Sequence, residues 1–305
     1  GDALGYQWRF RSWVGDQWSV VSGATNYLFN QFNVSTDHSG DYSLIATNFV
    51  GSITSAVASV TVKALPSPRA VVGWGRNDYG QATVPAAAQN GVAAIAARNG
   101  ITVALKNDGT VMAWGNNGYG QTNVPGGLSG VVAIAAGDAH TAVLKGDGGV
   151  VAWGGVNHDF GQTTVPGAAQ NGVVAVAAGN AHTLVLKNDG TVAAWGNNNY
   201  GQTNVPAGLS GVLAIAAGSE HSVALKSDGT VVAWGRNDYG QTNVPAGLIG
   251  VVAIAAVDAH ALALKNDGTV AAWGQEWNGV GFSPALVPAG LSGVAAIAAG
   301  AMHTL

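Results

Sequence analysis

Histidine is the residue whose spacing in this sequence most suggests chemistry. It recurs at one position of a repeated phrase, as His140, His182, His221, His260 and His303. A metal site would need these imidazoles to converge, and one histidine per repeat without cysteine or carboxylate companions lacks the spacing of metal ligands. We therefore expect a structural histidine that hydrogen-bonds to neighbouring backbone.

No other set of residues predicts catalysis. Repeated Asp-Gly pairs such as Asp147-Gly148 are typical of tight hairpins, in which glycine accepts a positive φ. The glycine-rich phrase 115–120 lacks the Gly-Lys-Ser/Thr of a phosphate loop, and no Ser/His/Asp arrangement stands apart from the repeat. The absence of cysteine excludes disulfides and thiol catalysis. We expect a protein that is not an enzyme and that binds no cofactor and no metal.

Two loops that are longer than their counterparts are the candidate binding sites. The candidate residues are His158, Asp159 and Phe160 in the loop after Trp153, and Trp277 and Phe282 in the loop after Trp273. Extra length on a loop held by a rigid scaffold is a common place for recognition, and tryptophan is a frequent anchor. We expect Trp277→Ala to weaken partner binding by roughly 2 kcal/mol. The alternative is drift in a tolerant surface loop.

A repeated aromatic residue offers another kind of surface. It precedes Gly-Gln in successive repeats, as Tyr79, Tyr119, Phe160, Tyr200 and Tyr239. Exposed rings would form an aromatic rim suited to stacking on a glycan or a protein loop. Because the position recurs as part of the repeat, we prefer the alternative that each ring packs one repeat against its neighbour.

The elements that position these residues are the units of an internal repeat. A phrase ending in Trp-Gly recurs about every 40 residues, a period typical of solenoids and propellers. The apolar run 131–137 predicts one strand, and 140–145 and 149–154 follow at hairpin distance with Asp-Gly between them. The Thr-Asn-Val-Pro segment 122–125 and its copies suggest a short fourth strand at an outer edge.

A β-propeller fits this repeat better than a linear solenoid. Both alternating faces of 131–137 are apolar, so both faces of that strand should be covered by neighbouring sheets. A solenoid would need polar capping repeats, and none is visible. The repeat region 70–305 begins instead on third-strand residues, 70–75, and ends on first- and second-strand residues, 294–305. Together they would complete one sheet and close the ring.

The phrases AAGDAH, LKGDG and VVAWG, with Gly-Gln downstream, resemble the RCC1 repeat. The short period is similar to the bacterial branch of that family, to which the beta-lactamase inhibitory proteins belong. The resemblance covers about 70–305 and implies a β-propeller, usually of seven blades, but it implies little about activity. Six Trp-Gly units are present, so either six blades close the ring or a seventh lies beyond Leu305.

Residues 1–64 predict a separate domain. Tyr6-Gln7-Trp8 is typical of a strand, and 38–62 predicts two strands around an Asn/Gly turn. The pattern resembles the second half of an immunoglobulin-like domain, which implies that Trp8 is its core tryptophan and that Gly40-Asp41-Tyr42 is its tyrosine corner. Leu44 stands where a disulfide cysteine would be, and the first strands are missing.

The fold class we expect is therefore all-β. A partial immunoglobulin-like β-sandwich occupies 1–64, a short stiff linker rich in proline occupies 65–69, and an RCC1-like β-propeller occupies 70–305.

Charge and hydropathy limit the partners. The net charge is -4, and no Lys/Arg cluster provides the basic surface of a nucleic-acid binder. No apolar run approaches the roughly 20 residues of a membrane span. The absence of cysteine is compatible with export, and an upstream signal would lie outside this sequence. We expect an extracellular or cell-surface location in a bacterium.

The function we infer is a non-enzymatic protein-interaction or ligand-binding module of a larger exported protein, with a protein or glycan partner. The alternatives are a protein inhibitor of a secreted enzyme and a carbohydrate-active propeller enzyme, which would need paired carboxylates facing one cleft. The turns that would match the contact loops of a beta-lactamase inhibitor hold small polar residues such as Asp138-Ala139, which are poor hot spots. We expect no inhibition of class A beta-lactamases at micromolar concentration.

Overall fold

A computed structural model describes residues 5–12, 17–21, 39–48, 51–55, 57–60, 71–277, 281–300 and 303–304 of the chain. The chain divides into two compact units, Gly1–Ser67 and Pro68–Leu305. The division falls inside the segment 65–69 that the sequence predicts as a linker.

The described part of the first unit is one antiparallel sheet. Its strands are β1 (Gly5–Ser12), β2 (Ser19–Val20), β3 (Gly40–Asn48), β4 (Gly51–Thr54) and β5 (Ala58–Val60). β3 lies between β1 and β4 and also pairs with β5. Tyr42 is buried, with its ring centroid 4.9 Å from that of Phe10. A sandwich needs a second sheet, and the described residues of this unit form only one, so the immunoglobulin-like assignment stays a prediction.

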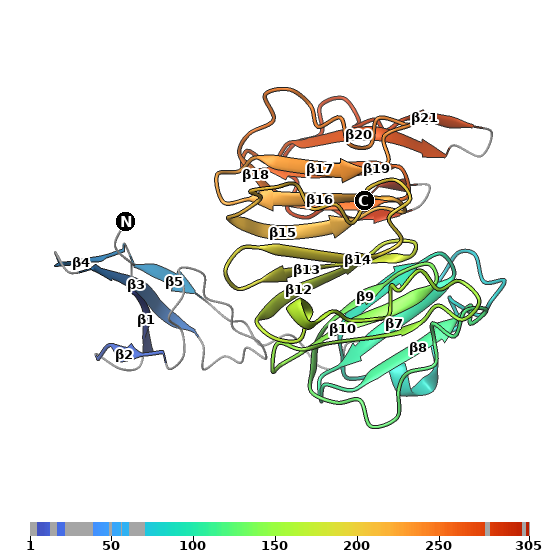
Figure 1. Cartoon of the computed structure of the whole chain (residues 1–305), viewed down its shortest axis with the longest axis horizontal. Coiled ribbons are helices and arrows are strands. Elements are labelled where there is room, and N and C mark those ends of the chain that lie inside the picture. The colour runs from blue at the N-terminus through green and yellow to red at the C-terminus, as the bar shows by residue number, and fades with distance from the viewer. Residues whose placement is uncertain are drawn as a thin grey trace. The chain divides into compact units, whose positions relative to one another are not determined.

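The second unit consists of successive antiparallel sheets, one from each repeat (Figure 1). The first three sheets contain β6 (Val92–Arg98), β7 (Ile101–Lys106) and β8 (Val111–Gly115); β9 (Val131–Ala136), β10 (His140–Lys145) and β11 (Val150–Gly154); and β12 (Val173–Ala178), β13 (His182–Lys187) and β14 (Val192–Gly196). The last three contain β15 (Val212–Ala217), β16 (His221–Lys226) and β17 (Val231–Gly235); β18 (Val251–Val257), β19 (His260–Lys265), β20 (Val270–Trp277) and β21 (Phe282–Pro284); and β22 (Ala299–Gly300) and β23 (His303–Thr304).

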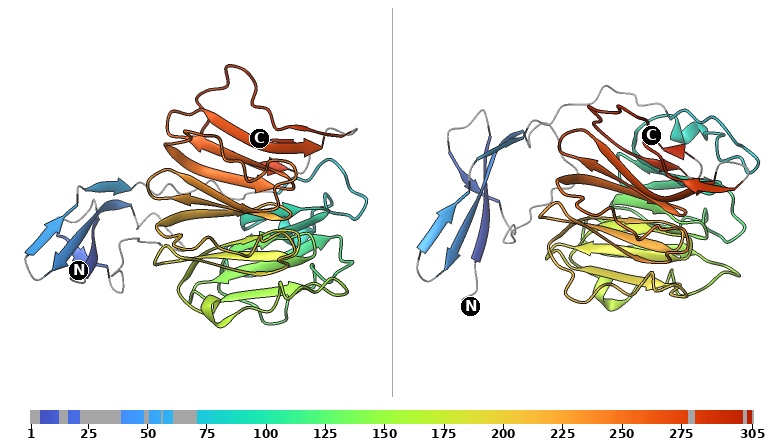
Figure 2. Two further views of the ribbon diagram at one scale, coloured as in Figure 1. Left: turned by 45° about the horizontal axis from the view of Figure 1, so that its top comes forward. Right: turned by 90° about the horizontal axis from the view of Figure 1, so that it is seen from above.

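The sheets follow one another around a common axis (Figure 2). The first strands of successive sheets are neighbours, from β6 through β9, β12, β15 and β18 to β22. Ala97, near the end of β6, lines one cavity together with 298–300, so the first and last repeats of the unit also meet. The predicted all-β propeller is therefore confirmed.

Helix contributes little to the described residues. It is limited there to two 3-10 turns, η2 (Ala86–Ala88) and η3 (Gly167–Ala169). Neither is long or apolar enough to cross a membrane.

The second strand of each full repeat is the most deeply buried element. In β10 every residue from His140 to Leu144 is buried, and β13, β16 and β19 show the same pattern. The first strand is only partly covered, and the exposed fractions of Ile95 and Val252 reach 51% and 55%. The expectation that both faces of the first strand are covered is confirmed in part, since Ile134, Ile215 and Ile254 pack against core clusters, but the middle strand is the one most fully sandwiched between neighbouring sheets.

Each Asp-Gly hairpin connects the second and third strands of its sheet and contacts the next sheet. These hairpins lie at one end of the ring, which we call the hairpin face. Gly148 has φ 81°, and a Cβ at this position would lie 3.0 Å from the backbone nitrogen of Gly172 in the next repeat. Its carbonyl accepts a hydrogen bond from the Val173 nitrogen at 3.2 Å. The Asp147 carboxylate accepts one from the Gly149 nitrogen at 3.0 Å, which confirms its predicted turn role.

Two strand predictions were wrong. Residues 122–125 form no strand, because the Thr122 and Asn123 nitrogens donate to loop acceptors, Asn117 Oδ1 at 3.0 Å and the Gly120 carbonyl at 3.1 Å. Among the described residues, a fourth strand exists only in the fifth sheet, where β21 pairs with β20. Residues 71–75, expected as the third strand of the closing sheet, form no strand either.

Candidate binding site

The end of the ring opposite the hairpin face carries the turns between first and second strands and the loops that follow the third strands. We call this end the loop face. At its axis, backbone hydrogen bonds link consecutive turns: the Asp138 nitrogen donates to Gly179 at 3.3 Å, Asn180 to Ser219 at 3.1 Å, and Ser219 to Asp258 at 3.0 Å. These turns form an axial collar that places equivalent side chains of different repeats close together.

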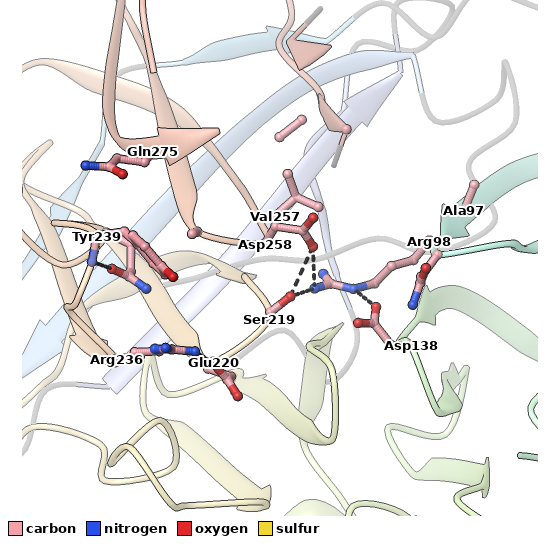
Figure 3. Close-up of a pocket in the computed structure, with 15 residues that line it drawn as sticks. Ala97, Arg98, Asp138, Ser219, Glu220, Arg236, Tyr239, Val257, Asp258 and Gln275 are labelled. Atoms are coloured by element: carbon pink, nitrogen blue, oxygen red, sulfur yellow. Dashed lines mark hydrogen bonds and ion pairs between the residues drawn. The ribbon is translucent and has the colours of Figure 1, made fainter. Parts of the chain in front are cut away.

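Arg98, at the end of β6, fills the centre of this axial collar (Figure 3). Its Nε donates to Asp138 in the second repeat. Its Nη1 donates to the Ala217 carbonyl at 3.2 Å, and its Nη2 to Ser219 Oγ at 3.1 Å, both in the fourth repeat. Asp258 of the fifth repeat lies 3.7 Å from Nη2. With only 6% of its side chain exposed, Arg98 links four repeats through one guanidinium group.

The first repeat alone carries arginine at this position. The second, third, fourth and sixth repeats have glycine there, and a Cβ at Gly137 would lie 2.6 Å from the ring of His140. The first repeat has Ile101 in place of the histidine, which leaves room for the Arg98 side chain. Val257 shows that the fifth repeat also departs from glycine.

A cavity of about 440 Å³ opens beside Arg98 on the loop face. Its charged lining groups come from four repeats and are Arg98, Asp138, Glu220, Arg236 and Asp258. We call it the axial cavity. Its lining combines charged groups of both signs with apolar side chains such as Val257 and Ala259, so a guest would have to match both kinds of surface.

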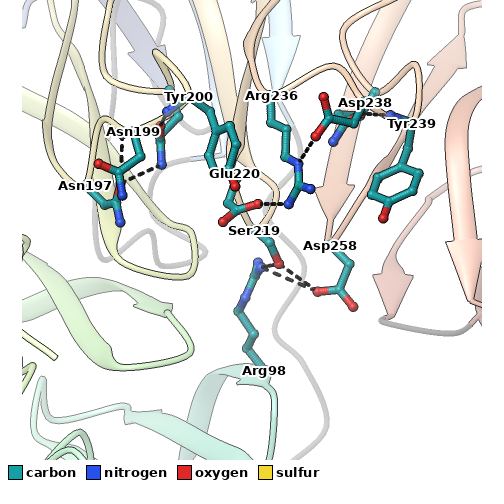
Figure 4. A network of polar contacts seen from close by, with 12 residues as sticks. Arg98, Asn197, Asn199, Tyr200, Ser219, Glu220, Arg236, Asp238, Tyr239 and Asp258 are labelled. Carbon is teal, nitrogen blue, oxygen red and sulfur yellow. Dashed lines mark hydrogen bonds and ion pairs between the residues drawn. The ribbon is translucent and has the colours of Figure 1, made fainter.

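Arg236 is held over the edge of the axial cavity by carboxylates and aromatic rings (Figure 4). Its Nη1 donates to Glu220 at 2.5 Å and its Nε to Asp238 at 2.7 Å. The guanidinium carbon lies 4.6 Å from the ring centre of Tyr200 and 5.4 Å from that of Tyr239. The hydrogen bond to Glu220 is the main cause that raises the pKa of Arg236, so this group remains charged.

The repeated aromatic residues mostly face solvent. The exposed fractions are 54% for Tyr79, 36% for Tyr119 and 43% each for Phe160 and Tyr200. We call these four side chains the aromatic rim. Tyr119 nevertheless contacts His158 and Tyr200 contacts Arg236, each in the following repeat, so the preferred expectation that the rings pack one repeat against its neighbour is confirmed in part.

The glutamine two residues later explains why the rings turn outward. Gln121 is fully buried, and its Oε1 accepts a hydrogen bond from the Tyr119 nitrogen at 2.8 Å. Gln162 does the same for Phe160 at 2.7 Å. The glutamine therefore occupies the interior position, and the aromatic ring is left on the surface of the loop.

The first predicted loop joins the aromatic rim. The His158 ring lies 5.2 Å from that of Tyr119 and 4.9 Å from that of Phe160, the latter edge-to-face. Val156 beside it is 57% exposed. Asp159 is exposed, and its carboxylate accepts a hydrogen bond from the Gly161 nitrogen at 2.8 Å. The structure therefore brings His158 and Phe160 together with Tyr119, whereas Asp159 serves the turn.

The second predicted loop is described only in its backbone. Trp277 and Phe282 are paired across β20 and β21. Residues 278–280 and the side chains of Trp277 and Phe282 lie outside the described residues, so their binding role stays a prediction. The two loops follow the second and fifth sheets and are not brought together.

The repeated histidines have a structural role, as the sequence predicts. His140 is fully buried, and its Nε2 lies 2.9 Å from Thr183 Oγ1 on the next sheet; the Nε2 of His182 is likewise 3.2 Å from Ser222 Oγ. The sequence interpretation, which named backbone as the partner, did not foresee these hydroxyl groups. Among the described residues, no three His, Cys, Asp or Glu side chains are grouped to hold a metal ion.

Burial keeps these imidazoles neutral. Desolvation, followed by the charge of Arg98, lowers the pKa of His140 to about 4 and those of His182 and His221 to about 3. A neutral imidazole can donate a hydrogen bond from Nε2 to the neighbouring hydroxyl oxygen, so the histidines link adjacent sheets through hydrogen bonds.

Arg98, Arg236 and Asp258 were missed by the sequence interpretation, which treated the axial turns only as small polar residues. The signal was a joint departure from the repeat, since Arg98 replaces glycine and Ile101 replaces histidine in the same unit. Each change alone resembles drift. The role of Arg98 becomes evident only when the structure shows its contacts with Asp138, Ala217 and Ser219.

The comparisons with known proteins agree with this architecture. A sequence model of the family described as Regulator of chromosome condensation (RCC1) repeat matches residues 92–121, 131–162, 173–202, 212–241 and 251–281. These matches together cover half of the chain. A search of curated proteins gave no significant match.

Solved structures of the same fold come from yeast and from a plant. Prp20p of Saccharomyces cerevisiae, described with its binding properties to Gsp1p and histones, has a TM-score of 0.60 and 21% identity, over 78% of this chain and 79% of that chain. The CRINKLY WD40 ectodomain of the Arabidopsis thaliana receptor kinase ACR4 has a TM-score of 0.57 and 21% identity, over 77% and 83%. Yeast RCC1 (Prp20) bound to Kap60 has a TM-score of 0.55 and 23% identity, over 72% and 68%. At these identities the likeness shows the fold alone.

Proposed function

Because this chain belongs to the RCC1 repeat family, we propose that it is a non-enzymatic protein-interaction module that binds its partner on the loop face of the propeller. The observation that carries the proposal is the aromatic rim. Its four exposed aromatic side chains lie on successive loops of the loop face, and the His158 ring contacts the rings of both Tyr119 and Phe160. Aromatic residues on a pre-organised surface are typical anchors of protein interfaces.

A protein partner is favoured over a glycan by the setting of the rings. Arg236, which lies over Tyr200 and Tyr239, adds a charged group of the kind enriched at protein interfaces. Two structures of one neighbour, yeast Prp20, are described with protein partners, Kap60 in one case and Gsp1p and histones in the other. These partners belong to that protein, and they support only the general class of interaction here.

The finer setting is also a proposal. We place the chain in a larger exported bacterial protein, where an immunoglobulin-like domain precedes the propeller. The pattern of 1–64 and the absence of cysteine support this setting. Cell fractionation with surface proteolysis is its test: we expect the protein in the surface or medium fraction, and recovery only from the cell interior would contradict it.

The test of partner binding compares three forms of the full chain on one support. They are the unchanged protein, the rim variant Tyr119→Ala/Phe160→Ala, and the control variant Leu213→Ala/Val252→Ala. The control removes two exposed apolar side chains from β15 and β18, beside the hairpin-face turn at Asp228. All three are exposed to extracellular protein fractions, and captured proteins are identified by mass spectrometry.

We expect at least one protein that the unchanged chain and the control variant retain and that the rim variant loses. Truncating a hot-spot aromatic residue costs about 2 kcal/mol or more, so the loss should be near complete at subsaturating concentration. Equal retention by the rim variant, or loss only in the control variant, would contradict the proposed surface. Retention that glycosidase treatment abolishes would replace the protein partner with a glycan.

A further inference from the structure

The axial cavity has an unequal balance of charge. Its lining includes three carboxylates, Asp138, Glu220 and Asp258, but only two guanidinium groups, Arg98 and Arg236. Asp238, which pairs with Arg236, adds a fourth carboxylate at the edge. The fixed charges around the cavity therefore sum to a negative value, which favours a cationic guest over an anionic one.

Both guanidinium groups already form ion pairs with carboxylates around the cavity. Arg98 pairs closely with Asp138 and also donates to Ser219 Oγ. Arg236 pairs with Glu220 and Asp238 at 2.5 and 2.7 Å. An anionic guest would have to compete with these pairs for its donors, and it would be repelled by the same carboxylates.

Asp258 is the lining carboxylate with the weakest partners. Its Oδ1 accepts a hydrogen bond from Ser219 Oγ at 3.0 Å, and Arg98 Nη2 is 3.7 Å away, beyond hydrogen-bond distance. Its side chain is 41% exposed, whereas that of Asp138 is 15% exposed. Asp258 is therefore both reachable and able to accept further hydrogen bonds.

Tyr239 also lines the axial cavity, on the other side of Asp258 from Arg98, and the Asp258 carboxylate points toward Ser219 and Arg98 (Figure 3). The Arg236 guanidinium carbon lies 5.4 Å from the centre of the Tyr239 ring, and both an aromatic ring and a carboxylate that line one cavity attract a cation. Gln275 also lines the cavity, and the apolar wall at Val257 suits an aliphatic stem.

We propose that the axial cavity binds the basic side chain of a partner protein, a lysine ammonium or an arginine guanidinium, with Asp258 as its ion-pair partner and Tyr239 as its aromatic wall. The inference rests on the proposed function, because it takes the guest to be part of a bound protein. The aromatic rim then supplies contacts elsewhere on the loop face, and the axial cavity selects for a positively charged side chain of the partner.

The test uses small probes and the full chain, so it needs no identified partner. Nα-acetyl-lysine methylamide and Nα-acetyl-arginine methylamide are titrated against the labelled protein, and amide chemical shifts are followed by NMR. Nα-acetyl-norleucine methylamide is the uncharged probe of matching shape. We expect millimolar binding of the two charged probes, with the largest shifts at Tyr239, Asp258 and Gln275, and no saturable shifts with the norleucine probe.

Two variants assign the binding to the cavity. Asp258→Asn keeps the side-chain shape and should weaken binding of the lysine probe roughly fivefold. Asp147→Asn removes the same charge from the hairpin face and should leave the affinity unchanged. The rim variant Tyr119→Ala/Phe160→Ala should also bind the probe normally, which separates failure of this inference from failure of the proposed partner surface.

Three results would overturn the inference. The first is equal binding of the norleucine probe, which would mean that charge plays no part. The second is an unchanged affinity in Asp258→Asn, and the third is the absence of saturable shifts with either charged probe.

Discussion

The same eight residues, Trp-Gly-Arg-Asn-Asp-Tyr-Gly-Gln, occur at 74–81 and at 234–241, and the two copies have different surroundings. Trp234 is 8% exposed and Trp74 is 85% exposed. The arginine side chains differ in the same direction, with 25% exposed for Arg236 and 73% for Arg76. Identical local sequence therefore leads to a buried tryptophan in one place and an exposed one in the other.

The loop itself is alike in both copies. The Tyr79 nitrogen donates to Gln81 Oε1 at 2.9 Å, and the corresponding bond from Tyr239 to Gln241 has the same length. The arginine also pairs with the aspartate two residues later in both. The octapeptide thus determines its own turn.

The neighbouring repeat determines whether the tryptophan is buried. The indole Nε1 of Trp234 donates to the Gln202 carbonyl of the preceding loop at 2.9 Å, and Trp114, Trp153 and their other buried copies do the same. The loop that would serve Trp74 is 275–288, which lacks the Gly-Gln phrase. Burial of tryptophan is therefore a property of adjacent repeats, as expected for a structure stabilised by nearest-neighbour interfaces.

The sharpest test of this comparison substitutes the tryptophan of each copy. Trp234→Ala should lower the free energy of unfolding by about 3–5 kcal/mol, because it leaves a cavity and an unpaired Gln202 carbonyl. Trp74→Ala should change it by less than about 1 kcal/mol. The measurement is urea unfolding of both variants. Similar losses of unfolding free energy would contradict the claim that the neighbouring repeat determines whether the tryptophan is buried.

Acid should weaken the repeats that contain buried histidine. In the folded protein, burial lowers the pKa values of His140, His182 and His221 below the ordinary value of 6.5, so the unfolded chain binds more protons below that pH. Stability should fall as pH drops from 6.5 towards about 4, by about 2 kcal/mol per histidine at about pH 5.

The control for acid sensitivity replaces a histidine with the residue that the first repeat has at the same position. His140→Ile introduces the residue found at position 101 and should reduce the stability difference between about pH 7 and about pH 5 by one histidine's share. The comparison is made within each variant, so a general loss of stability does not disturb it. An unchanged pH dependence would mean that His140 is not kept neutral by burial.

The arginines of the two copies should differ less than the tryptophans. Arg236→Ala removes contacts with Glu220 and Tyr200 and should cost about 1–2 kcal/mol of unfolding free energy. Arg76→Ala should leave the free energy of unfolding nearly unchanged, because Arg76 is largely exposed. Equal effects in urea unfolding would remove the distinction between the copies.

The smallest expected effect comes from a substitution that adds a hydroxyl–histidine hydrogen bond at the fifth sheet. Thr183 and Ser222 accept the histidine contact and also donate to the preceding glutamine carbonyl, but Ala261 occupies the equivalent position in the fifth sheet. Ala261→Ser should raise the free energy of unfolding by about 1 kcal/mol, through new bonds to His221 and the Gln241 carbonyl. Ser222→Ala is the matched loss, and a destabilised Ala261→Ser variant would contradict this account.

Much of the fold can be predicted from sequence alone, because the same pattern of strands and turns recurs in each repeat. Alternation, Asp-Gly turns and the recurring tryptophan predict the strands of each sheet and the ring. The fourth strand failed as a prediction because the loop residues, such as Asn117, satisfy backbone groups that a strand would need. The exposure of Trp74 could not be predicted either, since it depends on a loop remote in sequence.

The candidate site was harder to predict than the fold. The loop with His158 and Phe160 was identified by its length, but the outward position of the rings depends on which residue of the loop is buried. Gln121 and Gln162 take that interior place, and no periodicity distinguishes them from the aromatic residues beside them. Arg98 acts through contacts with repeats far along the chain, which sequence spacing does not convey.

The most direct measurement of the central claim is amide hydrogen exchange on the full chain with and without a partner captured through the rim. We predict slower exchange upon binding in the loop-face segments 119–121, 156–162, 197–201 and 236–241, and in the axial turn 258–259. The hairpin segments 107–109, 146–148, 188–190 and 227–229 should exchange at unchanged rates. Protection confined to the hairpin segments would contradict the account.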